Sequence, residues 1–124
     1  MLFRSSVVGP NVALGENVTV GANAVVENSV VDADTRIGAN ATLIDGVTGH
    51  GVQIGAGSTM VGGPGDVRVG DRIHENERLG AVLADRVRDG GGVTYAPGTV
   101  VGSDAVITAG TAVSGTVDDG TEVQ

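Results

Sequence analysis

The stretch VGPNVA-LGENVT-VGANAV (residues 8–25) repeats one six-residue pattern three times. Each hexad begins with an aliphatic residue that is followed by glycine, and a small or β-branched residue stands four positions after the first. The residues between these two positions are mostly turn formers. Because side chains of an extended strand alternate between its faces, a period of six with two inward positions does not fit one flat strand. The stretch therefore predicts short strands joined by tight corners.

The same spacing continues to Met60, with two five-residue steps, from Val26 to Val31 and from Leu43 to Thr48. It divides the chain into coils 8–25, 26–42 and 43–59, each with three strands and three corners. We predict an all-β fold, a left-handed parallel β-helix shaped as a triangular prism, whose coils stack about 4.8 Å apart. Glycine after each aliphatic anchor, and Asn or Gly two residues later, are expected to supply the positive φ angles of the corners.

The repeat stops after Met60-Val61, and residues 62–78 contain no hexad. We interpret this segment as a loop ejected from the helix. Anchors resume at Leu83 and recur every six residues to Val113, with Asp89 as the one acidic anchor. The chain is therefore predicted to be a single domain, with coils at 8–61 and 79–117, a loop at 62–78, and a polar tail at 118–124 that covers the open edge.

The composition narrows the possible partners. The chain has 124 residues, a net charge of −8 with seven Arg and no Lys, and no Cys. Such an acidic surface argues against nucleic acid and anionic membranes as partners, and no apolar run approaches the ~18 residues of a membrane span. A cytoplasmic location is expected. The acidic, Lys-free surface also predicts a halophilic source, because dense salt screens the mutual repulsion of the acids.

A single prism of this kind leaves aliphatic side chains on its outer faces. We expect Val25, Val31, Val100 and Val106 to lean outward. Packing three copies around an axis would bury such a face, so a homotrimer is predicted.

Three segments carry a resemblance to a known family: residues 54–59 (IGAGST), the loop 67–82, and the run 83–102. Together they resemble archaeal sugar-1-phosphate nucleotidyltransferases with a β-helical C-terminal half. That group includes bifunctional glucosamine-1-phosphate acetyltransferase/N-acetylglucosamine-1-phosphate uridylyltransferases and glucose-1-phosphate thymidylyltransferase-like proteins. The resemblance implies a role in sugar-nucleotide biosynthesis and a sugar phosphate or nucleotide sugar as ligand. Because the Gly-rich phosphate loop of the nucleotidyltransferase half is missing, that domain would be supplied in cis or in trans.

The acetyltransferase motif of these relatives is not intact. Their His and Tyr, in an H-x-x-Y pattern, fall on Ala39 and Thr42, whereas their following Asp is matched by Asp45. The main hypothesis is therefore a trimerising or regulatory β-helix of a sugar-1-phosphate nucleotidyltransferase. The alternative is an active acetyltransferase that moves acetyl from acetyl-CoA to an amino sugar phosphate of the glucosamine-1-phosphate type. A trimeric scaffold without activity is a third interpretation.

Two histidines are candidate catalytic bases for the acetyltransferase alternative. His50 stands at a corner of its hexad, and His74 lies in the ejected loop. Each is otherwise a solvated surface residue. A zinc site of the γ-carbonic-anhydrase kind needs three histidines, so no metal site is predicted.

Candidate ligand-binding residues are Arg68, Arg72 and Arg78 in the loop, together with Asp45 and Asp89. The arginines could clamp a phosphate or carboxylate, or form salt bridges with the acids of the same loop. Asp89 takes an interior position, where a carboxylate needs partners. Those partners could be corner amides or Arg86, or the residue could line a functional cleft.

Overall fold

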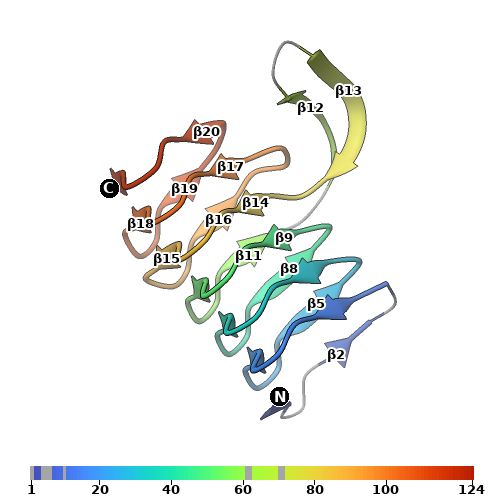
Figure 1. Ribbon diagram of the computed structural model, residues 1–124, viewed down its shortest axis with the longest axis vertical. Helices are drawn as coiled ribbons and strands as arrows, with labels where there is room; N and C mark the ends of the chain where they lie inside the picture. Colours follow the sequence, from blue (N-terminus) through green and yellow to red (C-terminus); the bar gives the residue numbers. More distant parts are fainter. Residues whose placement is uncertain (1, 4–6, 10, 61–62, 70–71) are drawn as a thin grey trace.

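The computed structural model describes the backbone of residues 2–3, 7–9, 11–60, 63–69 and 72–124, and the side chains of 8–9, 11–60 and 80–124. The chain winds through three parallel sheets in turn, so that each coil contributes one strand to each sheet (Figure 1). Sheet A contains β1 (Leu2–Phe3), β4 (Thr19–Val20), β7 (Arg36–Ile37), β10 (Gln53–Ile54), β15 (Arg88–Asp89), β18 (Val106–Ile107) and β21 (Glu122–Val123).

The other two sheets complete the triangle. Sheet B contains β2 (Val7–Val8), β5 (Val25–Glu27), β8 (Thr42–Ile44), β11 (Thr59–Met60), β16 (Thr94–Tyr95) and β19 (Ala112–Val113). Sheet C contains β3 (Ala13–Leu14), β6 (Val30–Val31), β9 (Val47–Thr48), β14 (Val82–Leu83), β17 (Val100–Val101) and β20 (Thr116–Val117). The three-sheet prism confirms the predicted parallel β-helix and is consistent with the left-handed form that hexads favour.

Register follows the predicted coil length. Ile37 pairs with Val20 in the coil before and with Ile54 in the coil after. Its neighbour Arg36 pairs in the same way with Thr19 and Gln53, on the outer side of the sheet. Corresponding residues of successive coils therefore form straight columns, one inside the prism and one outside on each sheet.

The inner columns form the hydrophobic core. Every predicted anchor from Val20 to Val113 is buried, including the polar Thr48 and Asp89. Val31 is one of these anchors and is 1% exposed, so its predicted outward position was wrong. The side chains four residues after the anchors are also buried, at the corners between two sheets, and they are small or β-branched, as at Ala24, Ala105 and Val87.

Two positions of each corner have different requirements: one needs a positive φ angle and the other needs space for the next coil. The third residue after an anchor does take a left-handed conformation, as at Asn40, with φ of 60°. The glycine directly after an anchor does not, and it is required for a different reason. A Cβ at Gly38 would lie 2.5 Å from the backbone nitrogen of Ala56 in the next coil. Glycine at this position therefore permits the close stacking of coils, and the predicted positive φ there was wrong.

The ejected segment is a β-hairpin. Strands β12 (Gly63–Val69) and β13 (Arg72–Leu79) pair antiparallel with an irregularity between Gly65 and Val67, and the hairpin projects away from the prism (Figure 1). It leaves sheet B after β11 and returns to sheet C at β14. The prediction of an ejected segment is confirmed, whereas its description as a loop missed the two strands.

The prism also extends beyond the predicted coils. Strand β1 pairs with β4, and β21, within the segment expected to be a polar tail, pairs with β18. In the described part of the chain, no helix has the length and hydropathy needed to span a membrane.

Candidate functional site

The predicted site residues are distributed over different edges of the prism. His50 lies at the corner between sheets C and A, Asp45 at the corner between sheets B and C, and Asp89 inside sheet A. The hairpin carries the other four. Cross-strand pairing sets His74 opposite Val67, Arg72 opposite Val69, Arg68 opposite Ile73 and Arg78 opposite Pro64. Their side chains lie outside the described residues, so the loop clamp and the second candidate base stay predictions.

Asp89 is enclosed by hydrogen bonds from the prism itself. Its Oδ1 accepts from the backbone nitrogens of Gly55 (2.6 Å) and Gly91 (3.0 Å) and from Ser58 Oγ (2.8 Å). Its Oδ2 accepts from the Tyr95 hydroxyl at 2.6 Å. Of the partners considered from sequence, the corner amides are therefore the ones found. The carboxylate joins the coils on either side of the hairpin insertion, which gives it a structural task.

The same cluster changes the chemistry of the tyrosine. Burial, the charge of Asp89 and the hydrogen bond to Asp89 together raise the pKa of the Tyr95 hydroxyl above its ordinary value of 10.0. The hydroxyl thus stays protonated and donates to a carboxylate that is 9% exposed. This arrangement satisfies a charge in the interior.

Asp45 stands at the foot of the hairpin. It adopts a φ of 57°, its Oδ1 accepts from Asn28 Nδ2 at 2.5 Å, and its carbonyl oxygen accepts from the nitrogen of Gly80 at 2.8 Å. Gly80 is the residue at which the chain returns from β13. The side chain and backbone of Asp45 therefore position the return of the hairpin into the prism.

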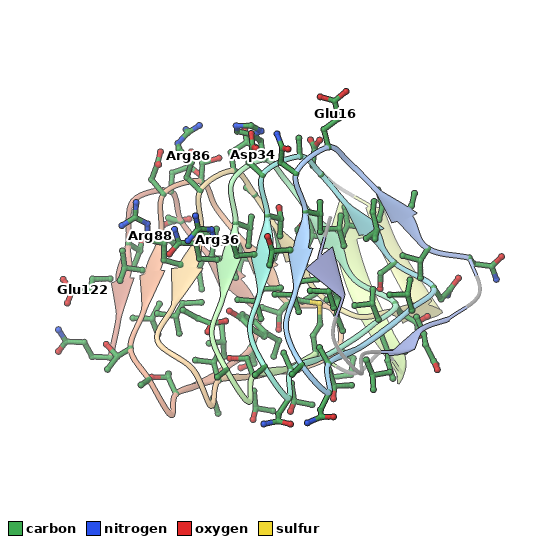
Figure 2. All side chains as sticks on the ribbon, turned by 90° about the horizontal axis from the view of Figure 1, so that it is seen from below. Glu16, Asp34, Arg36, Arg86, Arg88 and Glu122 are labelled. Carbon is green, nitrogen blue, oxygen red and sulfur yellow. The ribbon has the colours of Figure 1, made fainter. Side chains whose placement is uncertain are left out.

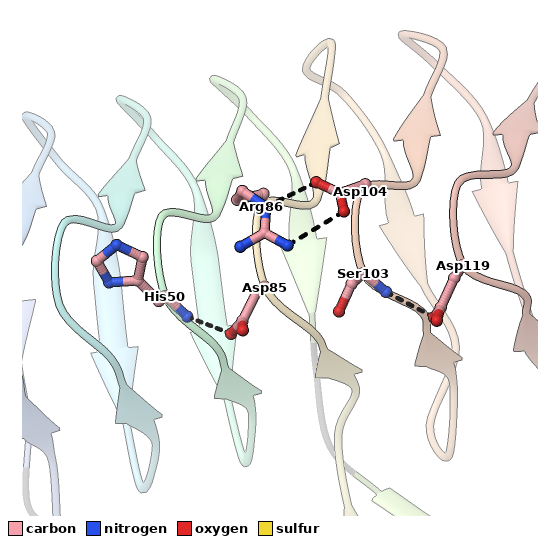
Figure 3. A network of polar contacts seen from close by, with 6 residues as sticks. All are labelled: His50, Asp85, Arg86, Ser103, Asp104 and Asp119. Carbon is pink, nitrogen blue, oxygen red and sulfur yellow. Dashed lines mark hydrogen bonds and ion pairs between the residues drawn. The ribbon is translucent and has the colours of Figure 1, made fainter.

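The corner between sheets C and A holds the histidine whose side chain is described. His50 Nε2 lies 3.5 Å from Asp34 Oδ2 in the preceding coil, and each side chain is about half exposed. The backbone nitrogen of His50 donates to Asp85 Oδ1 in the following coil at 2.8 Å (Figure 3). The following coil thus holds the backbone of His50 through Asp85, and the preceding coil places the Asp34 carboxylate beside its imidazole ring. Nε2 is therefore the ring nitrogen that faces Asp34.

The next coils repeat this corner with other charges. Arg86 Nε and Nη2 donate to Asp104 at 2.7 and 3.1 Å, and the nitrogen of Ser103 donates to Asp119 Oδ1 at 2.9 Å (Figure 3). The hydrogen bond from Arg86 holds the pKa of Asp104 below its usual range, and the same bond raises the pKa of Arg86. These two side chains therefore bind each other rather than His50.

An open, mainly apolar groove of about 630 Å³ runs along the outer face of sheet C. Val30, Val47 and Val82 form its floor. One edge includes Gly49 and Ala84, the residues immediately before His50 and Asp85. The groove therefore leads to the corner where the histidine lies.

Comparison with known proteins adds the fold class. No family model matches the chain, and no curated protein matches it in sequence. The acetyltransferase domain of PglB from Neisseria gonorrhoeae, in complex with acetyl coenzyme A, superposes with a TM-score of 0.79 at 23% identity, over 95% of this chain and 50% of that chain. PerB from Caulobacter crescentus, in complex with CoA and GDP-perosamine, gives a TM-score of 0.56 at 26% identity, over 93% of this chain and 48% of that chain.

The fold is that of hexapeptide-repeat acetyltransferases. The chain spans about half the length of these two structures. Neither of them is described as a nucleotidyltransferase, so the nucleotidyltransferase lineage expected from the resemblance stays a prediction.

Two features of the site were not found from the sequence. Asp34 was missed as the partner of His50, and so was a column of Arg36, Gln53 and Arg88 on the outer face of sheet A. The coil length gave part of the signal, because Arg36 and Gln53 are seventeen residues apart and occupy the same place in successive coils. Asp34 and His50 are sixteen residues apart, and the hairpin insertion separates Gln53 from Arg88 by thirty-five, so this spacing alone identifies neither pair.

Within the residues whose side chains are described, no group of three or more His, Cys, Asp or Glu side chains is arranged to hold a metal ion.

Proposed function

We propose that this β-helix is an acyltransferase that moves an acetyl group from acetyl-CoA to the amino group of an amino sugar carried on a phosphate or a nucleotide. The observation that carries the proposal is the His50–Asp34 pair, which is exposed at the end of an apolar groove. The fold shared with acetyltransferases that bind CoA and, in one case, a nucleotide sugar supports it. The proposal corresponds to the acetyltransferase alternative, with His50 as the base.

His50 would act as the general base. Its Nδ1 accepts a proton from the substrate amine as the nitrogen forms a bond to the thioester carbonyl carbon. The carbon–sulfur bond then breaks, and the imidazolium returns the proton to the sulfur of the released thiol. Asp34, whose Oδ2 lies 3.5 Å from Nε2, would orient the ring and balance the charge that the imidazole gains during the step. Acetyl-CoA and an amine thus become CoA and an amide.

The groove on sheet C fits the apolar part of the donor. Its floor of valines offers a surface for the pantetheine arm, and its edge at Gly49 adjoins His50. Small residues, Gly49 and Ala84, line this edge of the groove. The groove would therefore orient the thioester toward the base.

A homotrimer would complete this cleft. Val30 and Val47 are 51% and 41% exposed on sheet C, and Val82 and Val100 continue the stripe. A second copy packed against the open side of the groove would bury apolar surface and enclose the pantetheine arm between the two copies. We expect Val47→Asp to shift the protein to a monomer in size-exclusion chromatography with light scattering. Val106→Asp, on sheet A, is the matched control and should leave the assembly unchanged.

The decisive test is an acetyl-transfer assay that follows free thiol release. Glucosamine-1-phosphate and a nucleotide-linked amino sugar would be the acceptors, in dilute buffer and in multimolar KCl to address the halophilic prediction. We expect His50→Asn to lower kcat by about 10²–10⁴-fold, the usual contribution of a general base. Asp119→Asn, a carboxylate at the same corner that contacts Ser103, is the control and should retain activity.

Other outcomes reassign the function. Activity that survives His50→Asn and is lost in His74→Asn would move the base to the hairpin. A folded trimer that releases no thiol with either acceptor would favour the trimerising or regulatory role beside a nucleotidyltransferase. The observation in favour of that second candidate is that Ala39 and Thr42 occupy the positions of the relatives' catalytic pair. If His50 is the base, it lies at a different corner from Ala39.

A further inference from the structure

The outer face of sheet A carries a column of cationic and amide side chains. Arg36 of β7, Gln53 of β10 and Arg88 of β15 are consecutive rungs in register. All three are exposed, and Figure 2 shows both arginines on this face of the sheet. Among the residues with described side chains, neither Arg36 nor Arg88 forms an ion pair or a side-chain hydrogen bond.

Two acids at the adjoining corner already have other partners. Asp34, two residues before Arg36, contacts His50, and Asp104 is bound by both ends of the Arg86 guanidinium. Arg88 adds only a weak attraction that lowers the pKa of Asp104. Of the arginines whose side chains are described, Arg36 and Arg88 thus remain available, on a chain whose net charge is −8. An acidic protein that leaves two arginines unpaired on one flat face presents a local site for an anion.

The spacing indicates the kind of anion. Neighbouring strands of a sheet lie about 4.8 Å apart, so the backbones at Arg36 and Arg88 are separated by about 10 Å across Gln53. The long arginine side chains can reach toward each other across this distance. Each guanidinium group can donate two parallel hydrogen bonds to phosphoryl oxygens. The Gln53 amide offers one more donor between them. A single phosphate meets one guanidinium group well, whereas a diphosphate can meet both.

We propose that the column Arg36–Gln53–Arg88 on the outer face of sheet A binds the diphosphate group of a ligand. Under the proposed function, two substrates carry this group, namely coenzyme A and a nucleoside-diphosphate sugar. The inference rests on the proposed function only for the source of the diphosphate. Binding of the group itself is a property of the column and is measurable without acetyl transfer.

The first experiment measures binding of inorganic pyrophosphate to the intact chain by calorimetry at low ionic strength. We expect pyrophosphate to bind more tightly than inorganic phosphate, with an affinity that falls as salt is added. Arg36→Gln with Arg88→Gln should weaken binding by about tenfold or more, the loss expected for charge-assisted hydrogen bonds. Gln53→Glu, which places a carboxylate between the two guanidinium groups, should weaken it at least as much.

Arg86→Gln is the matched control, because Arg86 is a neighbouring arginine that already binds Asp104. It should change pyrophosphate affinity less than about twofold, a difference below 0.5 kcal/mol. Absence of pyrophosphate binding, or binding that the Arg36 and Arg88 changes leave intact, would overturn the proposal. Thermal denaturation of each variant shows that the comparison is made between folded proteins.

Competition then identifies the source. Displacement of pyrophosphate by CoA but not by GDP assigns the column to the acetyl donor, and the reverse assigns it to the acceptor. Displacement by neither overturns the assignment to a substrate diphosphate. Loss of acetyl transfer in His50→Asn with pyrophosphate binding retained would separate the base from this column. Each proposal can therefore fail without the other.

Discussion

The carboxylates of the prism form two kinds of cluster, one buried inside sheet A and one exposed at a corner. Inside, Asp89 is 9% exposed and accepts four hydrogen bonds from the backbone, Ser58 and Tyr95. Outside, at the corner between sheets C and A, Asp34 and Asp104 are about half exposed and contact His50 and Arg86. The inner carboxylate has its hydrogen bonds supplied by the protein, whereas the outer groups remain about half exposed to solvent.

The difference follows from burial. A charge removed from water must be compensated by hydrogen bonds, so the buried carboxylate is surrounded by donors that the fold holds in place. Exposed charges are screened by water, so their pairs contribute little to stability and are easily exchanged. The most unusual residue of the sequence pattern, Asp89, is therefore explained by the fold. The side chains at the corner, by contrast, stay exposed to solvent and can exchange their partners.

The largest expected effect comes from Asp89→Ala. It would leave the nitrogens of Gly55 and Gly91 and two hydroxyls without their acceptor in the interior, and it would remove the link between the coils beside the hairpin. We expect a loss of about 3–5 kcal/mol in the free energy of unfolding, measured by denaturant titration. Asp119→Ala, which removes one exposed contact to Ser103, should cost about 0.5 kcal/mol or less. Equal losses at both positions would remove the distinction between the two clusters.

The sequence predicted the interior better than the corners. Anchors such as Val20 and Met60 could be placed because a repeated core position tolerates one kind of side chain, and their spacing survives the five-residue steps. The hairpin was missed as structure because its strands pair with each other and carry no hexad signal. The His50–Asp34 contact was missed because it joins coils, and single-residue reading along the chain does not show which corners stack.

A pH experiment tests the inner cluster more gently. The pKa of Tyr95 is raised in the folded protein, so above pH 10 the unfolded chain loses the phenolic proton while the folded chain keeps it. The unfolded state then binds fewer protons, and the free energy of unfolding falls by up to about 1.4 kcal/mol per pH unit. Tyr95→Phe should be less stable at pH 8 by about 1–2 kcal/mol but should lose this slope between pH 10 and 11.

The composition of the chain makes the slope near pH 10 simple to assign. The chain has one Tyr and no Cys or Lys, so the phenol is the side chain that titrates near pH 10. A slope that persists in Tyr95→Phe would mean that the hydroxyl is not held protonated by Asp89.

The smallest effect is expected at the outer cluster. The hydrogen bond from Arg86 holds the pKa of Asp104 below its usual range. Any stabilisation from this pair is present at neutral pH and is lost as the pH falls through the lowered pKa, but it is small because both side chains are solvated. Arg86→Gln should return the Asp104 titration to the ordinary range in carboxyl-carbon NMR, with the denaturation midpoint at pH 7 unchanged within error, because both side chains are solvated. A marked fall in the midpoint would instead show that the exposed corner, like Asp89, holds the coils together, and the division between a structural interior and a chemically available corner would then have to be redrawn.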